Sequence, residues 1–218
     1  MWKQYAPDEI EAKSFSTIRD EVGDLPYHRL ANAVIYRVIH ATADLSFATE
    51  MHFSENACER AQEAIYAGSA LITDTNMTRA GINQKTAEQY GGTICCYVGD
   101  EAIRQAAHEK QTTRSIVAVE YAVSQFPGAI FVIGNAPTAL LRLCELIEEK
   151  KARPACVIGV PVGFVNVVES KQILMQTNVP HIVAKGRKGG STVAAAIVNA
   201  LLYGENAPGY AFAVNRRP

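Results

Sequence analysis

Apolar residues in this chain fall into short runs separated by longer amphipathic segments. Five runs are nearly uniformly apolar and rich in β-branched residues, and Gly, Pro, Asn or Asp lies at their ends. We predict that these runs are β-strands: residues 70–73, 93–98, 129–133, 155–160 and 181–184. Strands without a polar face are typical of a parallel sheet that helices cover on both sides.

Segments with helical spacing of apolar residues lie between the predicted strands. The predicted helices are residues 55–67, 83–90, 100–110, 114–125, 137–150, 169–177 and 191–203. Ser54 and Pro137 fit helix starts, and Gly68 fits a helix end. An additional helix over residues 26–40 follows an irregular N-terminal arm. The alternation predicts an α/β fold, a three-layer α/β/α sandwich with a mainly parallel five-stranded sheet.

The domain organisation follows from length and from the absence of linkers. A chain of 218 residues fits one large domain better than two complete ones. We find no repeat of fixed period and no Pro/Ser/Gly-rich stretch that would mark a boundary. We therefore expect residues 1–218 to form a single domain, with the arm and the additional helix, about residues 1–45, outside the repeating units.

Charge and cysteine content exclude several classes of protein. Lys and Arg number 21 against 22 Asp and Glu, which gives a net charge of −1, whereas nucleic-acid-binding proteins usually carry a cationic excess. The first residues lack the features of an export signal, and no apolar run approaches the ~20 residues that cross a bilayer. Five cysteines without a C-x-x-C pair do not make a disulfide framework. We expect a cytoplasmic protein with structural thiols and no nucleic-acid or membrane partner.

The carboxyl ends of the strands are where ligands bind in open parallel sheets. The segments that follow the predicted strands are rich in polar residues: residues 73–79, 99–100, 134–138, 161–164 and 185–191. Any one of these segments alone fits a simple turn or helix cap. Their occurrence at one edge of the predicted sheet favours a binding site there.

Nucleotide and metal sites are poorly supported. The glycine-rich residues 186–191 open a predicted helix whose N–H groups could hold an anion. However, G-x-G-x-x-G and G-x-x-x-x-G-K-[ST] are both absent, and the five histidines are dispersed without H-E-x-x-H or a close Cys/His set. We expect no metal and no cofactor, and a nucleotide-binding oxidoreductase on the same architecture stays as an alternative.

His40 and Arg114 each have a simple structural explanation. His40 ends the additional helix, where the helix dipole and the last carbonyl groups favour a histidine. Arg114 follows Thr113 at the start of a predicted helix. The pattern alone assigns neither residue a role in chemistry.

Several separated motifs occur in order between Ser14 and Tyr203. They are Ser14-Phe-x-x-Ile-Arg19, Arg37-x-Ile-His40, Thr73-Asp74 with Met77-Thr78, Gly134-Asn-Ala-Pro-Thr138, Val157-Ile-Gly-Val-Pro-Val-Gly-Phe164 with Glu169-Ser-Lys171, and Gly186-Arg-Lys-Gly-Gly-Ser191. With this order and spacing the chain resembles the precorrin-8X methylmutase family, including the cobalt-precorrin-8 enzymes of the anaerobic route.

The resemblance implies an isomerase that moves a methyl group from C11 to C12 of a corrin precursor in cobalamin biosynthesis, giving hydrogenobyrinate or cobyrinate. The family reaction is regarded as an acid-assisted 1,5-sigmatropic shift without a redox cofactor. His40 matches the family's proposed acid, and an imidazole with a pKa of ~6.5 holds and releases a proton near neutrality. The resemblance also implies a homodimer with the substrate cleft near the subunit boundary.

A corrin precursor combines a broad apolar ring with many carboxylates, so its site needs both hydrogen-bond donors and apolar faces. Residue matching implies five donors: Ser14, Thr73, Arg114, Asn135 and Thr138. It implies three contacts to the ring: Phe15, Ala136 and Phe164. Secondary candidates, which fit structural ion pairs equally well, are Arg19, Arg37, Arg79 and Lys185.

The backbone amides of the Asn-Ala-Pro segment are further candidates for a substrate carboxylate. The same binding loops would suit a corrinoid carrier without turnover, which is the main alternative function. The aerobic and anaerobic branches share these motifs, so they leave open whether the substrate contains cobalt.

Overall fold

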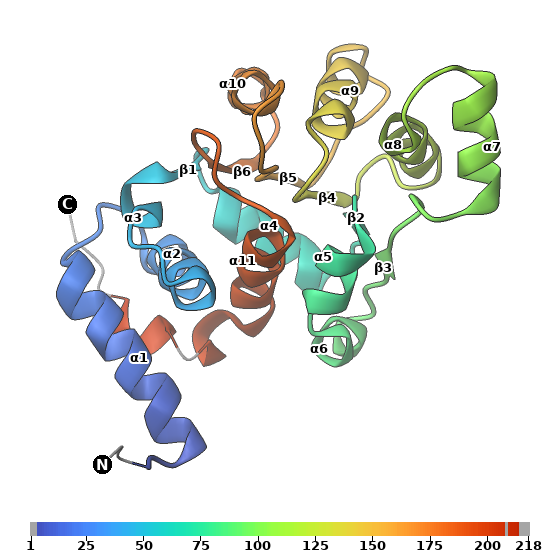
Figure 1. Cartoon of the computed structure of the whole chain (residues 1–218). Coiled ribbons are helices and arrows are strands. Elements are labelled where there is room, and N and C mark those ends of the chain that lie inside the picture. Colours follow the sequence, from blue (N-terminus) through green and yellow to red (C-terminus); the bar gives the residue numbers. More distant parts are fainter. Residues whose placement is uncertain (1–3, 208, 214–218) are drawn as a thin grey trace.

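A six-stranded sheet forms the centre of the protein (Figure 1). The computed structural model describes residues 4–207 and 209–213. The strands are β1 (Met51–Phe53), β2 (Leu71–Thr73), β3 (Ile94–Cys95), β4 (Ile130–Ile133), β5 (Cys156–Gly159) and β6 (His181–Ala184). Their order is β1-β6-β5-β4-β2-β3, and all neighbours are parallel except β1, which runs antiparallel to β6. The predicted α/β architecture is confirmed.

Two details of the predicted sheet are wrong. The sheet has six strands instead of five, because the edge strand β1, Met-His-Phe, has no β-branched residue and so lacks the pattern that identified the others. The strand expected at residues 93–98 is reduced to the two residues of β3, which pairs only with β2 at the opposite edge of the sheet. Both differences lie at edges, where a strand has one neighbour and needs fewer apolar residues.

Helices cover both faces of the sheet, which explains why the strands have no polar face. One face carries α2 (Arg29–Thr42), α3 (Phe47–Glu50), α4 (Ala57–Tyr66), α5 (Asn76–Gly81), α6 (Gln84–Gln89) and α11 (Ser191–Tyr203). The other face carries α8 (Arg114–Gln125), α9 (Pro137–Glu148) and α10 (Val167–Met175), with α7 (Glu101–Glu109) outside α8. Two short 3-10 turns, η1 (Gly204–Asn206) and η2 (Tyr210–Phe212), follow α11.

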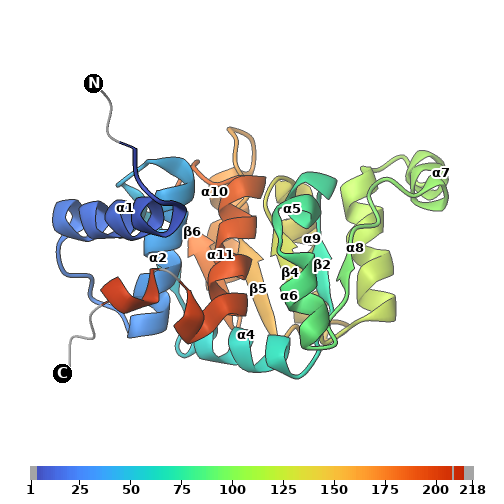
Figure 2. The ribbon, with the colours of Figure 1, turned by 90° about the horizontal axis from the view of Figure 1, so that it is seen from below.

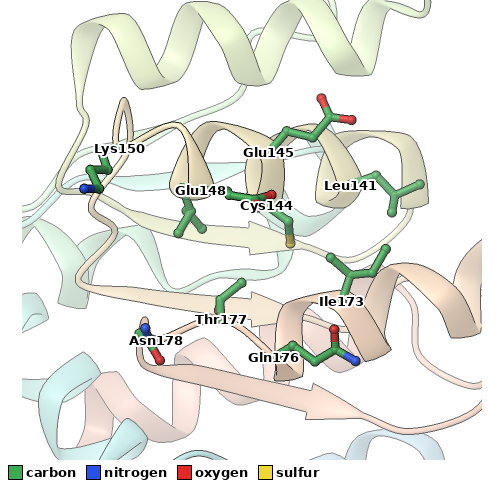
Figure 3. A pocket seen from close by; sticks show the side chains of 10 residues that line it. Leu141, Cys144, Glu145, Glu148, Lys150, Ile173, Gln176, Thr177 and Asn178 are labelled. Carbon is green, nitrogen blue, oxygen red and sulfur yellow. The ribbon is translucent and has the colours of Figure 1, made fainter.

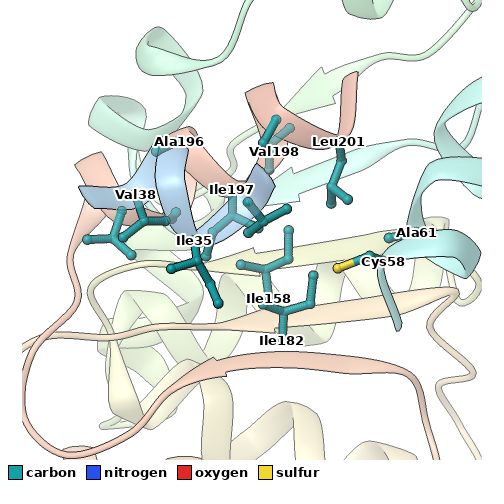
Figure 4. Packing of buried hydrophobic residues seen from close by; sticks show 14 of the residues in the cluster. Ile35, Val38, Cys58, Ala61, Ile158, Ile182, Ala196, Ile197, Val198 and Leu201 are labelled. Carbon is teal, nitrogen blue, oxygen red and sulfur yellow. The ribbon is translucent and has the colours of Figure 1, made fainter. Parts of the chain in front are cut away.

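Alternate residues of each strand enter different cores. In β4, Ile130 and Val132 join the core under α2, α4 and α11, whereas Phe131 and Ile133 join the core under α8, α9 and α10. Figure 4 shows the first core, where Ile158 of the sheet lies near side chains from three helices. Burial of such side chains stabilises the fold by about 1.5–3 kcal/mol each.

The N-terminal arm is not irregular, as the sequence had suggested, but forms helix α1 (Pro7–Val22). Figure 2 shows α1 packed outside α2, away from the sheet. Glu9 accepts a hydrogen bond from the backbone N–H of Ala6 at 3.1 Å, which supports the start of the helix. Among the side chains of α1 that the structure describes, only Phe15 and Ile18 are buried, so the sequence of this helix is too polar to show a clear period.

The predicted helix boundaries are partly confirmed. Pro137 is the first residue of α9. Gly68 has φ of 81° just after α4 and donates to the carbonyl of Ile65, as expected for a helix end. Ser54 does not begin α4, because its hydroxyl oxygen accepts the backbone N–H of His181 and so joins the chain to β6. Within the part of the chain that the structure describes, no helix is long and apolar enough to span a membrane.

Candidate active site

The end of α2 lies at the carboxyl edge of the parallel strands. Because β1 is antiparallel to β6 and Met51 pairs with Ala184, the segment from α2 to β1 arrives at the edge where β6 ends. His40 is in the last turn of α2 and is exposed there. The structure therefore brings His40 to the edge where ligands bind in this class of fold.

Two residues of α1 fix the imidazole ring of His40. Ser14 Oγ lies 2.9 Å from His40 Nδ1, and the ring of Phe15 stacks on the imidazole at 4.9 Å between centroids and 14° between planes. The resemblance implies that Phe15 contacts the substrate ring. In the structure Phe15 has no exposed surface and packs against His40 instead. With Nδ1 held by Ser14, Nε2 is the ring nitrogen left for chemistry.

The environment of His40 favours release of a proton. Burial lowers the pKa of His40, Arg37 lowers it further, and Glu11 raises it. The Arg37 guanidinium forms an ion pair with Glu11, with 2.7 Å between Nη1 and Oε1, and lies 5.6 Å from the centre of the Tyr203 ring. Arg37 is therefore a structural partner of α1 that also raises the acidity of the His40 imidazolium.

A pocket of about 310 Å³ adjoins His40 between α2, α5 and α11. Its lining residues are Arg37, His40, Ala41, Met77, Gly81, Ser191, Thr192, Ala195, Ala196 and Asn199. Two of the segments predicted to bind ligand, residues 73–79 and 185–191, thus contribute Met77 and Ser191. The first of these segments is partly helical, because α5 begins within it. Met77 is 71% exposed, so an apolar side chain is available beside the histidine.

The backbone N–H groups that we expected to bind a substrate carboxylate donate to the side chain of Asp74 instead. Its carboxylate accepts the N–H groups of Gly134, Asn135 and Ala136 at 2.9, 2.8 and 2.7 Å. Burial raises the pKa of Asp74, and the three amide donors oppose that rise. The expectation for the Asn-Ala-Pro amides is therefore wrong: they hold the β4–α9 loop to the end of β2.

The other predicted donors differ in availability. Thr73 is buried and donates its hydroxyl to the carbonyl of Cys95 at 3.2 Å. Thr138 Oγ1 lies 3.5 Å from Thr113 Oγ1. Asn135 is exposed, whereas Ala136 is buried.

The charged and aromatic candidates also differ. Arg19 forms an ion pair with its neighbour Asp20 at 2.8 Å. Phe164 is 85% exposed, and the Arg187 guanidinium lies 5.6 Å from the centre of its ring. Arg114 is exposed in the first turn of α8 and has no hydrogen-bond or ion-pair partner among the described residues. Arg79 and Lys185 are exposed as well.

The candidate residues form two groups. Ser14, Phe15 and Arg37 gather around His40 on one face of the sheet. Arg114 begins α8, which packs against α7 and α9 on the opposite face. Arg114 is not among the residues that line the His40 pocket.

The sequence analysis missed a link beside the site. Lys188 Nζ donates to Asp44 Oδ2 and to Ser46 Oγ, both at 2.7 Å, and this lowers the pKa of Asp44 to about 2. The contact joins the segment after His40 to the β6–α11 loop. Asp44 and Lys188 are 144 positions apart, so no local motif could reveal the pair.

A second pocket, of about 700 Å³, lies between α9 and α10 on the other face (Figure 3). It contains none of the predicted site residues, and its floor includes Cys144, a buried thiol whose pKa burial raises to about 12. A protonated, buried thiol is unreactive. The smaller pocket beside His40 is the candidate active site, because it has a titratable group in a fixed orientation.

An open, mainly parallel α/β sheet with polar loops at its carboxyl edge is typical of enzymes that bind a metabolite there, and a histidine at that edge is suited to acid–base chemistry. Comparison with known proteins gives the family. The model of the precorrin-8X methylmutase family matches residues 9–204. This chain therefore belongs to the precorrin-8X methylmutase family, isomerases of cobalamin biosynthesis, and the resemblance inferred from the motifs is confirmed.

Individual relatives match over most of their length. The cobalt-precorrin-8 methylmutase of Priestia megaterium is 42% identical over 195 residues, which is 89% of this chain and 87% of the relative. That of Salmonella typhimurium is 43% identical over 203 residues, 90% of this chain and 95% of the relative. The crystal structure of precorrin-8X methylmutase from Thermus thermophilus has a TM-score of 0.82 at 39% identity, and the match covers 88% and 95% of the two chains.

Proposed function

We propose that this protein moves a methyl group from C11 to C12 of precorrin-8X or cobalt-precorrin-8, giving hydrogenobyrinate or cobyrinate, with His40 as the general acid. One observation carries the assignment: the imidazole of His40 is hydrogen-bonded to Ser14, stacked on Phe15 and open to a pocket at the carboxyl edge of the sheet. A carrier protein would not need an oriented imidazole, so this geometry favours the enzyme over the non-catalytic alternative.

The proton transfer follows from the Ser14–His40 contact. In the imidazolium, Nδ1–H donates to Ser14 Oγ, and Nε2–H protonates the macrocycle. The C11–methyl bond then breaks as the C12–methyl bond forms, and Nε2 takes the proton back. Because Nδ1 stays protonated throughout, Ser14 keeps the transfer at Nε2. The reaction is an isomerisation and needs no other reactant.

The substrate's carboxylates and apolar ring are assigned to the remaining candidates. Exposed Arg114 and Asn135, with half-buried Thr138, supply donors from the α8–α9 side, and Phe164 offers an exposed apolar ring. Thr73 and Ala136 are buried, and their proposed role is to shape the loops at the strand ends that contact the substrate. Arg19 and Arg37, on α1 and α2, are assigned to anionic side chains of the substrate, which would share these guanidinium groups with their acidic partners Asp20 and Glu11.

Arg114→Ala is expected to weaken product binding by roughly ten- to a hundred-fold. A charge-assisted hydrogen bond to a carboxylate contributes about 1.5–3 kcal/mol, which corresponds to that factor. The measurement is an absorbance titration with the corrin product. Arg60→Ala, an exposed arginine on α4, is the matched control and should keep the wild-type affinity. An unchanged affinity in Arg114→Ala would remove Arg114 from the site.

The working unit is proposed to be a homodimer with the cleft near the subunit boundary. The separation of Arg114 from His40 onto opposite faces supports this, because a two-fold partner can complete the wall that one chain leaves open. Each protomer, residues 1–218, acts as one methylmutase domain. All five cysteines are free, which suits a reducing cytoplasm.

Mixing His40→Ala with Arg114→Ala should restore activity if the two residues meet across the boundary. Each mixed dimer then contains one site with both wild-type residues, so about a quarter of the wild-type sites return after random exchange of subunits. Sedimentation at micromolar concentration reports the oligomeric state of the same samples. A fully active monomer, or a mixture no more active than its components, would contradict the shared site.

A further inference from the structure

Lys171, in α10, is a buried lysine that the proposed chemistry does not use. Only 1% of its surface is exposed. Its ammonium group donates to the carbonyl oxygens of Gly186 and Lys188 at 2.9 and 2.7 Å. Burial lowers the pKa of Lys171 to about 8, and the Glu50 carboxylate opposes that change. A buried ammonium group needs hydrogen-bond acceptors, and the acceptors of Lys171 are these two backbone carbonyls. They identify the segment of the chain that Lys171 fixes in place.

Both acceptors belong to the β6–α11 loop, residues 185–190, which touches three parts of the candidate site. Lys188 reaches Asp44, in the segment that follows His40. Arg187 lies over the ring of Phe164, and its carbonyl accepts the N–H of Gly163 at 3.2 Å. The loop then leads into the start of α11, whose first residues line the His40 pocket. One loop therefore contacts the segment that follows His40, contacts the exposed aromatic ring and leads into the helix that lines the pocket.

Glycines make up half of this loop, so the side chains of Lys185, Arg187 and Lys188 are the only ones that can help to hold its shape. Gly186, Gly189 and Gly190 all have positive φ, and a Cβ atom at Gly189 would collide with the carbonyl group of Val160. Glycines lose more conformational freedom on ordering than other residues, so a glycine-rich loop needs ties from outside. Lys171 provides two such hydrogen bonds from α10, on the face of the sheet opposite to the His40 pocket.

We propose that Lys171 is a positioning residue: by binding the carbonyls of Gly186 and Lys188, it sets the loop that presents Arg187 to an anionic corrin substrate. This inference rests on the proposed function. The ammonium group faces loop carbonyls and not the pocket, so Lys171 governs how tightly the substrate is held and leaves the methyl shift to His40.

The first test is a split between KM and rate in Lys171→Met, which keeps the length of the side chain but removes its donors. We expect KM for the corrin substrate to rise about tenfold, with the single-turnover rate at saturation within about threefold of wild type. Lys85→Met, an exposed lysine on α6, is the matched control and should change neither value. An unchanged KM in folded Lys171→Met would overturn the proposal.

Limited digestion with trypsin gives a readout that does not depend on activity. The loop contains three exposed trypsin sites: Lys185, Arg187 and Lys188. We expect the first cuts in Lys171→Met to fall in this loop, earlier than in wild type or Lys85→Met. First cuts elsewhere, at the wild-type rate, would overturn the proposal. If wild type itself does not convert the substrate, the proposed function fails, while the digestion still decides whether Lys171 holds the loop.

Lys188→Met covers the case in which Lys171→Met does not fold. Lys188 is exposed, so its replacement does not threaten the core, but it cuts the tie from the same loop to Asp44. The expected result is again a several-fold higher KM with a nearly unchanged single-turnover rate. A wild-type KM in Lys188→Met would show that the position of the loop does not set affinity, and would overturn the proposal.

Discussion

His40→Ala is expected to lower the single-turnover rate of methyl migration by about 10²–10⁴-fold, the usual contribution of a general acid. The fold should survive, because His40 is an exposed residue in the last turn of α2. Product binding should be largely retained, since the acid acts in the chemical step. The measurement is anaerobic rapid mixing of enzyme with substrate, followed by absorbance, with a separate titration of product.

The same helix offers a matched control. His28, exposed at the other end of α2, should be replaceable by alanine without loss of rate.

The pH dependence of the rate is a second test of His40. Burial lowers the pKa of His40, so the rate should fall as pH rises through a value below ~6.5, where the imidazolium loses its proton. His40→Ala should lose this dependence. A near-wild-type rate in His40→Ala would remove the residue from the mechanism.

Asp74→Asn is expected to destabilise the protein by about 3 kcal/mol. The carboxylate accepts three backbone N–H groups with two oxygens, whereas the asparagine side chain has one oxygen and an NH₂ group that cannot accept from these donors. For a chain of this size that loss lowers Tm by roughly 6–12 °C. Thermal unfolding followed by circular dichroism measures it. Asp100→Asn, an exposed change just before α7, should have little effect. Equal Tm values for the two variants would contradict the role given to Asp74.

The sequence predicted the central part of the fold better than its edges. The segments 129–133, 155–160 and 181–184 lie close to β4, β5 and β6, because burial on both faces makes their composition distinctive. The edge strand β1 and helix α1 escaped prediction for the opposite reason. Each is held by contacts with elements far along the chain, β6 in one case and α2 in the other, and carries little apolar signal of its own.

The sequence identified residues of the candidate site, but it could not predict the contacts between them. The motif resemblance singled out His40 and Ser14, yet only the structure shows the hydrogen bond between positions 26 residues apart. Residue matching to the family implies that Phe15 contacts the substrate ring, but the structure buries Phe15 beneath the histidine. Asp74 and Lys171 were visible as parts of motifs, and their roles depend on loops that sequence cannot place.

The most direct test of the central claim is a single-turnover conversion by the purified wild-type protein under anaerobic conditions. The substrate would carry a ¹³C-labelled methyl group at C11, and carbon NMR would follow its position. We predict that the label appears at C12 without added metal, nucleotide or reductant. Bound substrate whose label stays at C11 would contradict the account and leave a corrinoid carrier in its place.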